Sequence, residues 1–405
     1  AILTALAEGR SCITGFLRST DCLTLLEVMQ TLGARYHFED ATLVVEGTAG
    51  RLQAPPGPLD LGNSGTGIRL LAGVLAGQPF VAELTGDASL RARPMARIKE
   101  PLERMGAQVE LLGAAGGAPL RIRGGALRGI DYQPPVASAQ VKSCVLLAGL
   151  YARGVTRVIE PVPTRDHTER LLAAMGAPVV VSGNTVTVTG CAARLKAGTW
   201  RVPGDFSSAA FWITAAAAWP GSSVRVEGVG LNPRRCVLLD VLRRMGADIN
   251  AEPDAAAGTC EPAGTVTVHG TRLRGVEVGG AEIPDLIDEL PLVAVAGALA
   301  TGRTVIRDAA ELRVKESDRI RSVAANLERL GVRVEERPDG LIIEGPARVR
   351  GGVALPSYGD HRLPMAMSLL ALRAEKAVRL EDIDCVAKSY PEFWADLRKV
   401  GGEAC

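Results

Sequence analysis

The sequence has few cysteine and histidine residues, and they are not arranged as metal ligands usually are. Its eight cysteines are scattered without a C-x-x-C pair, and it has only four histidines in 405 residues. A structural zinc site needs about four closely spaced Cys or His ligands. Scattered thiols are typical of reduced cytosolic proteins rather than of disulfide-linked secreted domains. We therefore expect no metal and no disulfides.

Long apolar runs and an excess of one charge are also missing. The longest apolar stretches, residues 209–220 and 291–301, fall short of the ~20 residues that span a membrane. The 46 Lys and Arg residues nearly balance the 45 Asp and Glu residues, so no overall field draws the chain to nucleic acid or to a membrane surface. We expect neither kind of partner, and any anion-binding site must be local.

What the sequence does contain is one pattern repeated six times. A helix-like segment ends at a glycine that suits the left-handed residue after a helix, and the six glycines are Gly33, Gly106, Gly176, Gly246, Gly331 and Gly401. Alternating or β-branched strands follow, at residues 42–46, 120–123, 185–189, 265–269 and 341–344. Almost wholly apolar helices, which must be buried, come next at residues 68–76, 145–151, 209–218 and 292–299.

The six repeats predict an α/β fold of two similar domains, each made of three units. Length alone also favours two domains. The boundary is expected near residues 201–208, which gives domains of 1–202 and 203–405. Residues 1–9 match the end of a buried helix, so the first unit is expected to lack a strand and one helix start.

Polar and small residues precede the buried helices. They occupy residues 61–66, 137–140, 203–208, 284–289 and 358–362. A helix start exposes free N–H groups and a partial positive charge, which suit a phosphate or a carboxylate. Simple N-capping is the commoner explanation for any single start. Several starts that converge would form a strong anion site.

Seven strings, in this order along the chain, resemble the enolpyruvyl transferase family: LGNSGTGIR at 61–69, GDASLRARPM at 86–95, SAQ at 138–140, PGDFSSA at 203–209, KESDR at 315–319, DHR at 360–362 and AKSYPE at 387–392. The resemblance implies two inverted α/β domains that face each other across a substrate cleft. In the UDP-N-acetylglucosamine branch a reactive cysteine stands six residues before the Pro of an Arg-Pro pair. Counting back from Pro94 gives Ala88, which favours the EPSP synthase branch.

The resemblance implies transfer of the enolpyruvyl group of phosphoenolpyruvate to the 5-hydroxyl of shikimate 3-phosphate, with release of phosphate. The residues implied for phosphoenolpyruvate are Asn63, Gly65, Arg93, Gln140, Arg319, Arg362 and Lys388. Those implied for shikimate 3-phosphate are Ser138, Ala139, Gln140, Arg165, Asp288 and Lys315. The C-terminal domain would hold the phosphoenolpyruvate and proton-transfer side.

Asp288 and Glu316 are the carboxyl groups that the resemblance assigns to proton transfer. Asp288 would hold and deprotonate the 5-hydroxyl, and Glu316 would exchange a proton with the methylene carbon. The alternatives are an N-cap for Asp288 and an i,i+3 partner of Arg319 for Glu316. Asp285 or Glu289 could take the place of Asp288. The cations could instead be surface residues paired with acids.

Further expectations come from the same resemblance. The protein would be a monomer of the bacterial cytoplasm that needs no cofactor, and glyphosate would inhibit it because Gly65 leaves room where Ala would not. The family's Pro-Gly-Asp-Lys-Ser string, followed by His-Arg, would stand immediately before Ala1, and its lysine, serine and arginine touch both substrates. Without them we expect weak activity, or a protein that binds its ligands without turning them over.

Overall fold

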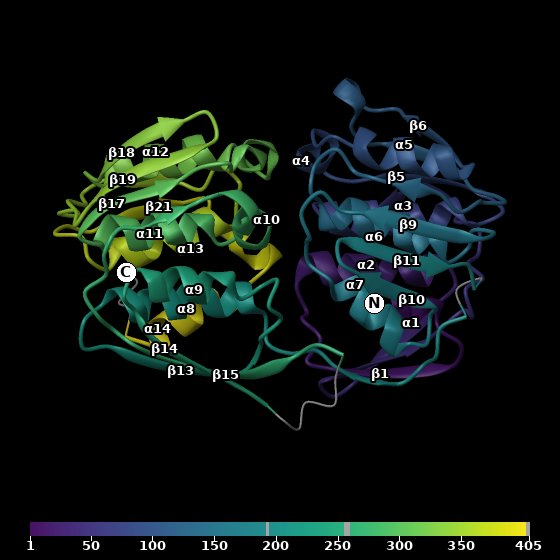
Figure 1. Ribbon diagram of the computed structural model, residues 1–405, viewed down its shortest axis with the longest axis horizontal. Coiled ribbons are helices and arrows are strands. Elements are labelled where there is room, and N and C mark those ends of the chain that lie inside the picture. The colour runs from purple at the N-terminus through teal and green to yellow at the C-terminus, as the bar shows by residue number, and fades with distance from the viewer. Residues whose placement is uncertain (192–193, 255–259, 402–405) are drawn as a thin grey trace. The chain divides into compact units, whose positions relative to one another are not determined.

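The computed structural model describes residues 1–191, 194–254 and 260–401. The chain divides into two units: unit 1 is Ala1–Val202 with Thr259–Glu261, and unit 2 is Pro203–Gly258 with Pro262–Cys405 (Figure 1). Each unit has its own cluster of buried apolar side chains. The end of the sixth repeat, Gly402, lies outside the described residues.

Unit 1 contains three sheets of four strands with one shared pattern. The first has the order β12 (Thr199–Arg201), β1 (Arg10–Thr14), β3 (Thr42–Glu46), β2 (Arg35–Glu39). The second has the order β4 (Leu59–Asp60), β5 (Val81–Thr85), β7 (Leu120–Arg123), β6 (Gln108–Leu111). The third has the order β10 (Val179–Ser182), β11 (Thr185–Thr189), β9 (Val155–Ile159), β8 (Asp131–Tyr132). In each sheet a short parallel strand joins three antiparallel ones.

The helices of unit 1 fall into a buried set and an outer set. The buried helices are α1 (Ile2–Leu6), α3 (Gly65–Ala76) and α6 (Ala139–Gly149). The outer helices, each with an exposed side, are α2 (Thr20–Thr31), α5 (Ala96–Met105) and α7 (His167–Ala174). A single turn, α4 (Ala88–Arg91), follows β5. The buried helices α3 and α6 lie against each other, so their first turns are neighbours.

Unit 2 repeats the arrangement with sheets of three, four and two strands. The first has the order β13 (Ser223–Gly230), β15 (Ala263–His269), β14 (Asp248–Pro253). The second has the order β16 (Glu277–Val278), β17 (Gly302–Ile306), β19 (Gly340–Gly345), β18 (Arg333–Arg337). The third is the pair β20 (Ala354–Pro356) and β21 (Arg379–Glu381).

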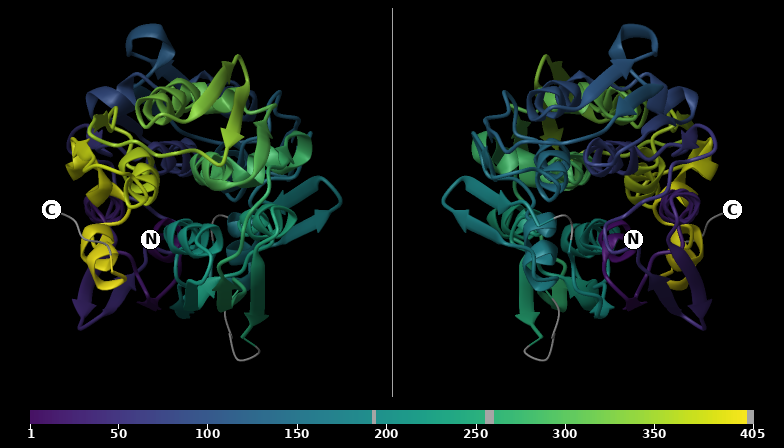
Figure 2. Two further views of the ribbon diagram at one scale, coloured as in Figure 1. Left: turned by 90° about the vertical axis from the view of Figure 1, so that its left-hand side faces the viewer. Right: turned by 90° about the vertical axis from the view of Figure 1, so that its right-hand side faces the viewer.

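The buried helices of unit 2 are α8 (Phe206–Ala218), α11 (Leu290–Leu299) and α13 (Arg362–Ala371). These three pack against one another at the centre of the unit. The outer helices are α9 (Val237–Arg244), α12 (Arg319–Arg329) and α14 (Phe393–Lys399). The three repeats can be followed in teal, green and yellow in the left view of Figure 2.

The predicted α/β repeats are confirmed. All six hinge glycines have left-handed backbones, with φ from 81° to 113°. The strands expected at 42–46, 120–123 and 185–189 have those bounds in the structure. One expected helix is displaced, because α6 begins at Ala139 rather than at residue 145. Lys142 and Ser143 interrupt the apolar pattern there, yet both are buried.

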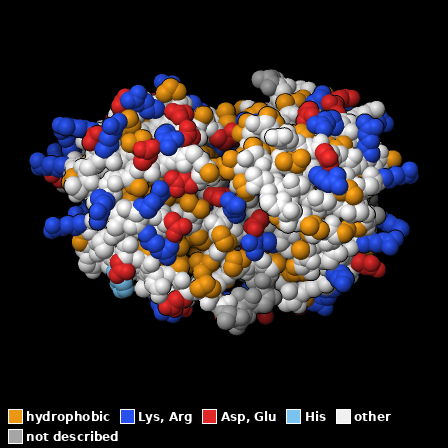
Figure 3. Space-filling view, viewed as in Figure 1, with side chains coloured by type: hydrophobic (Ala, Val, Ile, Leu, Met, Phe, Trp, Pro, Cys, Tyr) orange, Lys and Arg blue, Asp and Glu red, His pale blue; other side chains and the backbone are white. Residues whose placement is uncertain are grey.

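The surface of the molecule carries both charges. Acidic and basic side chains are interspersed over the visible face (Figure 3). Within the described residues, none of the helices combines the length and the apolar character needed to span a bilayer.

Candidate active site

Arg319, the first residue of α12, is the centre of a charged cluster in unit 2. Its side chain is only 1% exposed. Nε donates to Asp360 Oδ2 at 2.6 Å, and NH2 donates to Glu316 Oε2 at 2.6 Å. NH1 donates to Asp288 Oδ1 at 3.3 Å. A guanidinium can be buried this deeply because carboxylates occupy each of its nitrogens.

Ionisation in the cluster is strongly perturbed. Burial opposes the charge on Asp360, but the attraction of Arg319 outweighs it and lowers the pKa of Asp360 to about 2. The pKa of Arg319 is raised, since Asp360 and Glu316 more than offset its burial. Burial, followed by repulsion from Arg362, lowers the pKa of His361 to about 4. Burial also lowers the pKa of Lys315. Asp360 is therefore a fixed anion and His361 a neutral ring at neutral pH.

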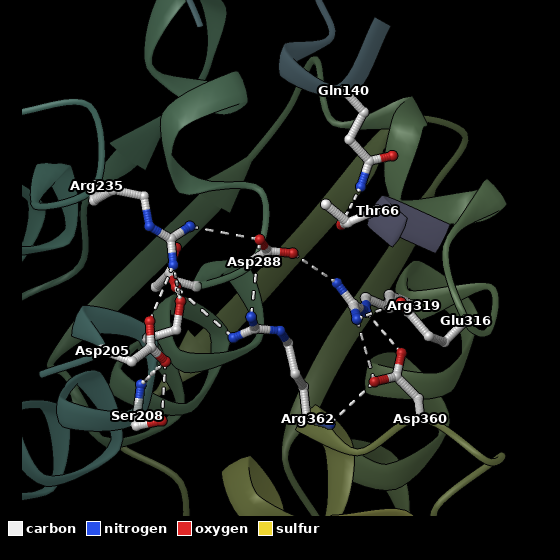
Figure 4. Close-up of polar contacts among 12 residues, drawn as sticks. Thr66, Gln140, Asp205, Ser208, Arg235, Asp288, Glu316, Arg319, Asp360 and Arg362 are labelled. Carbon is white, nitrogen blue, oxygen red and sulfur yellow. Dashed lines mark hydrogen bonds and ion pairs between the residues drawn. The ribbon is translucent and has the colours of Figure 1, made fainter. Parts of the chain in front are cut away.

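Three guanidinium groups surround Asp288. NH1 of Arg319 is 3.3 Å from Oδ1, while NH1 of Arg235 and NH2 of Arg362 are 3.7 and 3.8 Å from Oδ2. Figure 4 shows the three cations converging on this carboxylate from different elements. Asp288 lies in the short link between α10 (Ile283–Leu286) and α11, and its side chain is 18% exposed.

Arg362 is a cation of this cluster with a donor to offer to an anion. It is the first residue of α13, and its backbone N–H donates to Asp360 Oδ1 at 3.0 Å. Its guanidinium stands 3.7 Å from Glu289 and 3.8 Å from Asp288, which are ion-pair rather than hydrogen-bond distances. Its Nε is buried and has no hydrogen-bond partner within the described part of the chain. A bound carboxylate or phosphate would satisfy that donor.

Two other expected residues of unit 2, Lys315 and Glu316, lie next to this cluster along the chain, whereas Lys388 lies well beyond Arg362. Lys315 and Glu316 link the turn η3 (Ala310–Val314) to α12. Lys388 ends the turn η4 (Ile383–Lys388), which packs against α13. The i,i+3 ion pair considered as an alternative for Glu316 is present, since Glu316 is bound to Arg319. Asp288 does not cap α11, whose N-cap is Glu289.

In unit 1 the start of α3 brings together Asn63, Gly65 and Arg93. Asn63 Oδ1 accepts from Arg93 NH2 at 2.8 Å, and its Nδ2 donates to Asp87 at 2.8 Å. Ser64 caps the helix by accepting from the N–H of Gly67 at 3.0 Å. A β-carbon at Gly65 would stand 2.7 Å from NH1 of Arg93, so the guanidinium lies directly over this backbone.

The starts of α6 and α3 are joined by Gln140. Its Nε2 donates to Thr66 Oγ1 at 2.8 Å, and its Oε1 accepts from Arg69 NH1 at 2.5 Å. Ser138 caps α6 by accepting from the N–H of Val141 at 3.4 Å, and Ala139 is the first helical residue. Two helix starts, each with free N–H groups, are thereby held side by side.

Arg165 follows a buried network that holds its loop to α6. Lys142 Nζ lies 2.9 Å from Glu160 and 2.7 Å from Glu169. Glu160 Oε1 also accepts from the N–H and the hydroxyl of Thr164, at 3.0 and 2.5 Å. Thr164 directly precedes Arg165, so the network fixes the backbone of the predicted phosphate-binding arginine.

Several members of these clusters are not among the residues expected from the sequence. In unit 2 they are Arg235, Ser207 and Asp360, and in unit 1 they are Thr66, Arg69 and Asp87. Thr66, Arg69, Asp87, Ser207 and Asp360 stand inside strings that carry the resemblance, so proximity in sequence could have found them. Arg235 stands outside every string, in the segment Asn-Pro-Arg-Arg, and only the folded chain brings it to Asp288.

The chemistry available follows from the residue types. Buried guanidinium groups and open helix starts bind carboxylates and phosphates, and carboxyl groups beside them can move protons. Among the described residues there is no group of three or more His, Cys, Asp or Glu side chains that could hold a metal ion.

Comparison with known proteins agrees with this chemistry. The profile of the family EPSP synthase (3-phosphoshikimate 1-carboxyvinyltransferase) matches residues 1–397. The 3-phosphoshikimate 1-carboxyvinyltransferase of Salinibacter ruber is 49% identical over 99% of this chain and 93% of its own length. That of Gloeobacter violaceus is 50% identical over 98% of this chain and 92% of its own length. A solved structure of EPSP synthase from Acinetobacter baumannii has a TM-score of 0.86 and 41% identity, over 99% of this chain and 92% of that one. The resemblance read from the sequence is confirmed, and the chain belongs to the EPSP synthase family.

Proposed function

We propose that this protein transfers the enolpyruvyl group of phosphoenolpyruvate to the 5-hydroxyl of shikimate 3-phosphate and releases phosphate. Membership of the EPSP synthase family supports this reaction. The observation that carries it is the pair Arg319 and Arg362 beside Asp288 and Glu316. Two cations for an anionic substrate and two carboxyl groups for proton transfer stand together in one unit.

In unit 2, Arg362 and Arg319 are proposed to hold the carboxylate of phosphoenolpyruvate, with Lys388 toward its phosphate. Arg362 has a buried donor to offer, whereas Arg319 already donates to three carboxylates. The incoming carboxylate therefore has to replace Asp288 or Glu316 on Arg319. This exchange would release a proton-transfer group at the moment that substrate binds.

In unit 1, Ser138, Ala139, Gln140 and Arg165 are proposed to bind shikimate 3-phosphate at the start of α6. Its ring hydroxyls would be held by Asp288 and Lys315 of unit 2. Asn63, Gly65, Arg93 and Gln140 are proposed to face phosphoenolpyruvate at the start of α3, which Gln140 joins to α6. Residues 1–202 would thus form the shikimate 3-phosphate side, and residues 203–405 the proton-transfer side.

The proposed chemistry has two steps. Asp288 takes the proton of the 5-hydroxyl while the oxygen bonds to C2 of phosphoenolpyruvate, and Glu316 gives a proton to the methylene carbon C3. The methyl group then returns a proton to Glu316 as the C2–O bond to phosphate breaks, and the proton held by Asp288 passes to the departing phosphate. The products are the enol ether and inorganic phosphate.

Three finer points belong to the same proposal. We propose that the protein acts as a monomer in the bacterial cytoplasm, which fits its scattered cysteines. Glyphosate is proposed to compete at Gly65, where the absence of a side chain leaves Arg93 in place.

The test is a coupled phosphate-release assay in which each substrate is omitted in turn. We expect release only with both substrates, and Arg362→Gln should lower kcat/KM for phosphoenolpyruvate by about 100-fold. The matched control is Arg373→Gln, an exposed arginine just beyond the same helix, which should change it by less than about twofold.

The assay is run on the 405-residue chain and on the same chain preceded by a relative's segment that carries the Pro-Gly-Asp-Lys-Ser string and the following His-Arg pair. Calorimetry with each ligand accompanies it. Binding heat without phosphate release in both forms would favour the binding-only alternative. The absence of both binding heat and phosphate release would refute the proposal.

A further inference from the structure

Arg235 is a buried cation that the proposed reaction leaves without a role. It lies in the turn before α9, and its side chain is only 12% exposed. NH2 donates to Ser207 Oγ at 2.5 Å and lies 3.5 Å from Asp205. Ser207 in turn donates to the fully buried Glu289. The guanidinium is thus anchored on one side, and its NH1 points to Asp288 at 3.7 Å (Figure 4).

The three cations around Asp288 differ in what else they have to do. Under the proposed function, Arg319 and Arg362 also bind the substrate carboxylate. A bound carboxylate would neutralise much of their charge and would itself repel Asp288. The anchor of Arg235 is Ser207, which has no substrate role in the proposal. Arg235 is therefore the cation that stays with Asp288 when substrate is bound.

We infer that Arg235 is a positioning residue that holds Asp288 in place and ionised while the substrate carboxylate occupies Arg319 and Arg362. The inference rests on the proposed function for the identity of that carboxylate. It rests on the contacts of Arg235, Ser207 and Asp288 for the geometry.

Charged groups from several elements face Asp288 and its neighbours. The cations are Arg235 before α9, Arg319 of α12, Arg362 of α13 and Lys315 before α12. The acids are Glu289 beside it in sequence, Asp205 on Arg235, and Glu316 and Asp360 on Arg319. Removing Arg235 leaves all four acids in place, so the field at Asp288 becomes more negative. Asp288 should then take up a proton at higher pH than before.

The first test compares Arg235→Gln with a neighbouring control. Arg234 stands next in the chain, pairs with a different acid, Asp285, at 3.2 Å, and is 39% exposed. We expect Arg235→Gln to lower kcat about tenfold while KM for phosphoenolpyruvate changes less than about threefold. In the pH profile of kcat, the acid limb should move up by about one pH unit. The acid limb in the pH profile of kcat/KM should move by less. Arg235→Lys should restore the limb, and Arg234→Gln should leave every parameter near wild type.

The difference between the two limbs is diagnostic because kcat reports the substrate complex and kcat/KM the free enzyme. An unchanged acid limb in Arg235→Gln would overturn the inference, as would equal effects of the Arg234 and Arg235 variants. If Arg235→Gln does not fold, Ser207→Ala carries the test, because it keeps the cation and removes the hydroxyl that orients it. We expect this variant to lower kcat about threefold with little movement of the limb, and wild-type kcat would contradict the role.

A second test needs no turnover. With carboxyl-labelled aspartate, the ¹³C signal of Asp288 is assigned by its loss in Asp288→Asn and titrated with and without phosphoenolpyruvate. The midpoint should rise in Arg235→Gln, and it should rise more with the ligand bound. Absence of turnover in the wild-type protein would count against the proposed function. An unchanged titration midpoint of Asp288 in Arg235→Gln would count against the positioning role of Arg235.

Discussion

At the scale of single residues, Gly65 shows how an absent side chain shapes the site. The guanidinium of Arg93 lies across the backbone at this position, and Asn63 holds it at 2.8 Å. Gly65→Ala would bring a methyl group within 2.7 Å of NH1, so the flexible end of Arg93 has to move. We expect KM for phosphoenolpyruvate to rise about tenfold, as is usual when a charged hydrogen bond is lost. Steady-state kinetics measure the change.

The same substitution should weaken inhibition by glyphosate, because the methyl group fills the space proposed for it. Gly57→Ala is the matched control, since a β-carbon at Gly57 meets nothing within 4 Å. A normal KM in Gly65→Ala, or an equal rise in Gly57→Ala, would show that Arg93 does not serve phosphoenolpyruvate.

His361 predicts how stability depends on pH. Burial and then Arg362 lower its pKa in the folded protein to about 4, from about 6.5 when unfolded. Between these values the unfolded chain binds the proton and the folded chain does not, so stability is full above pH ~6.5 and falls as pH drops to ~4. A shift of this size corresponds to about 3 kcal/mol, and the partial exposure of the ring reduces it to about 2 kcal/mol.

Urea denaturation at a series of pH values measures this effect. In His361→Gln the free energy of unfolding should fall by about 2 kcal/mol less between pH ~6.5 and ~4 than in wild type. His269→Gln, which changes an exposed ring at the end of β15, should retain the wild-type dependence. Identical curves for wild type and His361→Gln would refute the assignment.

At the scale of elements, α6 is tied to α7 by a buried ion cluster. Lys142 is 1% exposed and contacts two buried acids, one of which, Glu169, belongs to α7. Burial raises the pKa of Glu169 even beside Lys142, so the cation is needed to keep this acid charged. Ser143 and Thr168 add a hydroxyl pair at 2.7 Å between the same helices. This buried ion cluster also holds the loop that carries Arg165.

Lys142→Met should destabilise the protein by about 3–5 kcal/mol, because it leaves two acids buried without their cation. Chemical denaturation measures the loss. Lys99→Met, a change at a partly exposed i,i+4 pair on α5, should cost less than about 0.5 kcal/mol. Adding Glu169→Gln to Lys142→Met should recover part of the loss, and failure to recover any would argue against the ion cluster as its cause.

Much at this scale could be predicted from the sequence, because it depends on local periodicity. The hinge glycines and the strand 42–46 follow from backbone preference and alternation. The two-residue parallel strands, such as β4 and β8, are too short to show a pattern and exist only through their partners. The start of α6 was predicted too late because the sequence shows Lys142 as a polar residue. The acids that allow it to be buried, Glu160 and Glu169, lie 18 and more residues away along the chain.

The residues of the candidate site likewise include some that the sequence could predict and some that it could not. Arg319 and Arg362 stand in strings that the family shares, so a resemblance could place them. Arg235 has no such string, and its meaning depends on three chain segments meeting at Asp288. Asp360 stands in the string DHR, yet its task of neutralising a buried Arg319 is visible only in the folded chain.

At the scale of the whole molecule, the chain has two separate apolar cores. The core of unit 1 is drawn from residues 2–195, and that of unit 2 from residues 206–397. All the strands in the sheets of unit 1 lie within residues 1–202. A core of this size is large enough to fold alone. We therefore expect residues 1–202, expressed as a fragment, to unfold cooperatively, as measured by circular dichroism in urea.

The same fragment separates binding from chemistry. It retains Ser138, Gln140 and Arg165 but lacks Asp288 and Lys315, so calorimetry should show shikimate 3-phosphate bound about 10- to 100-fold more weakly than by the full chain. Arg165→Gln in the fragment should abolish the heat, which would show that the ligand is bound through Arg165 of unit 1. Because the proton-transfer carboxyls are absent, phosphate release from phosphoenolpyruvate should be undetectable. A fragment that folds but binds no shikimate 3-phosphate would contradict the proposal that unit 1 supplies the main contacts of that substrate.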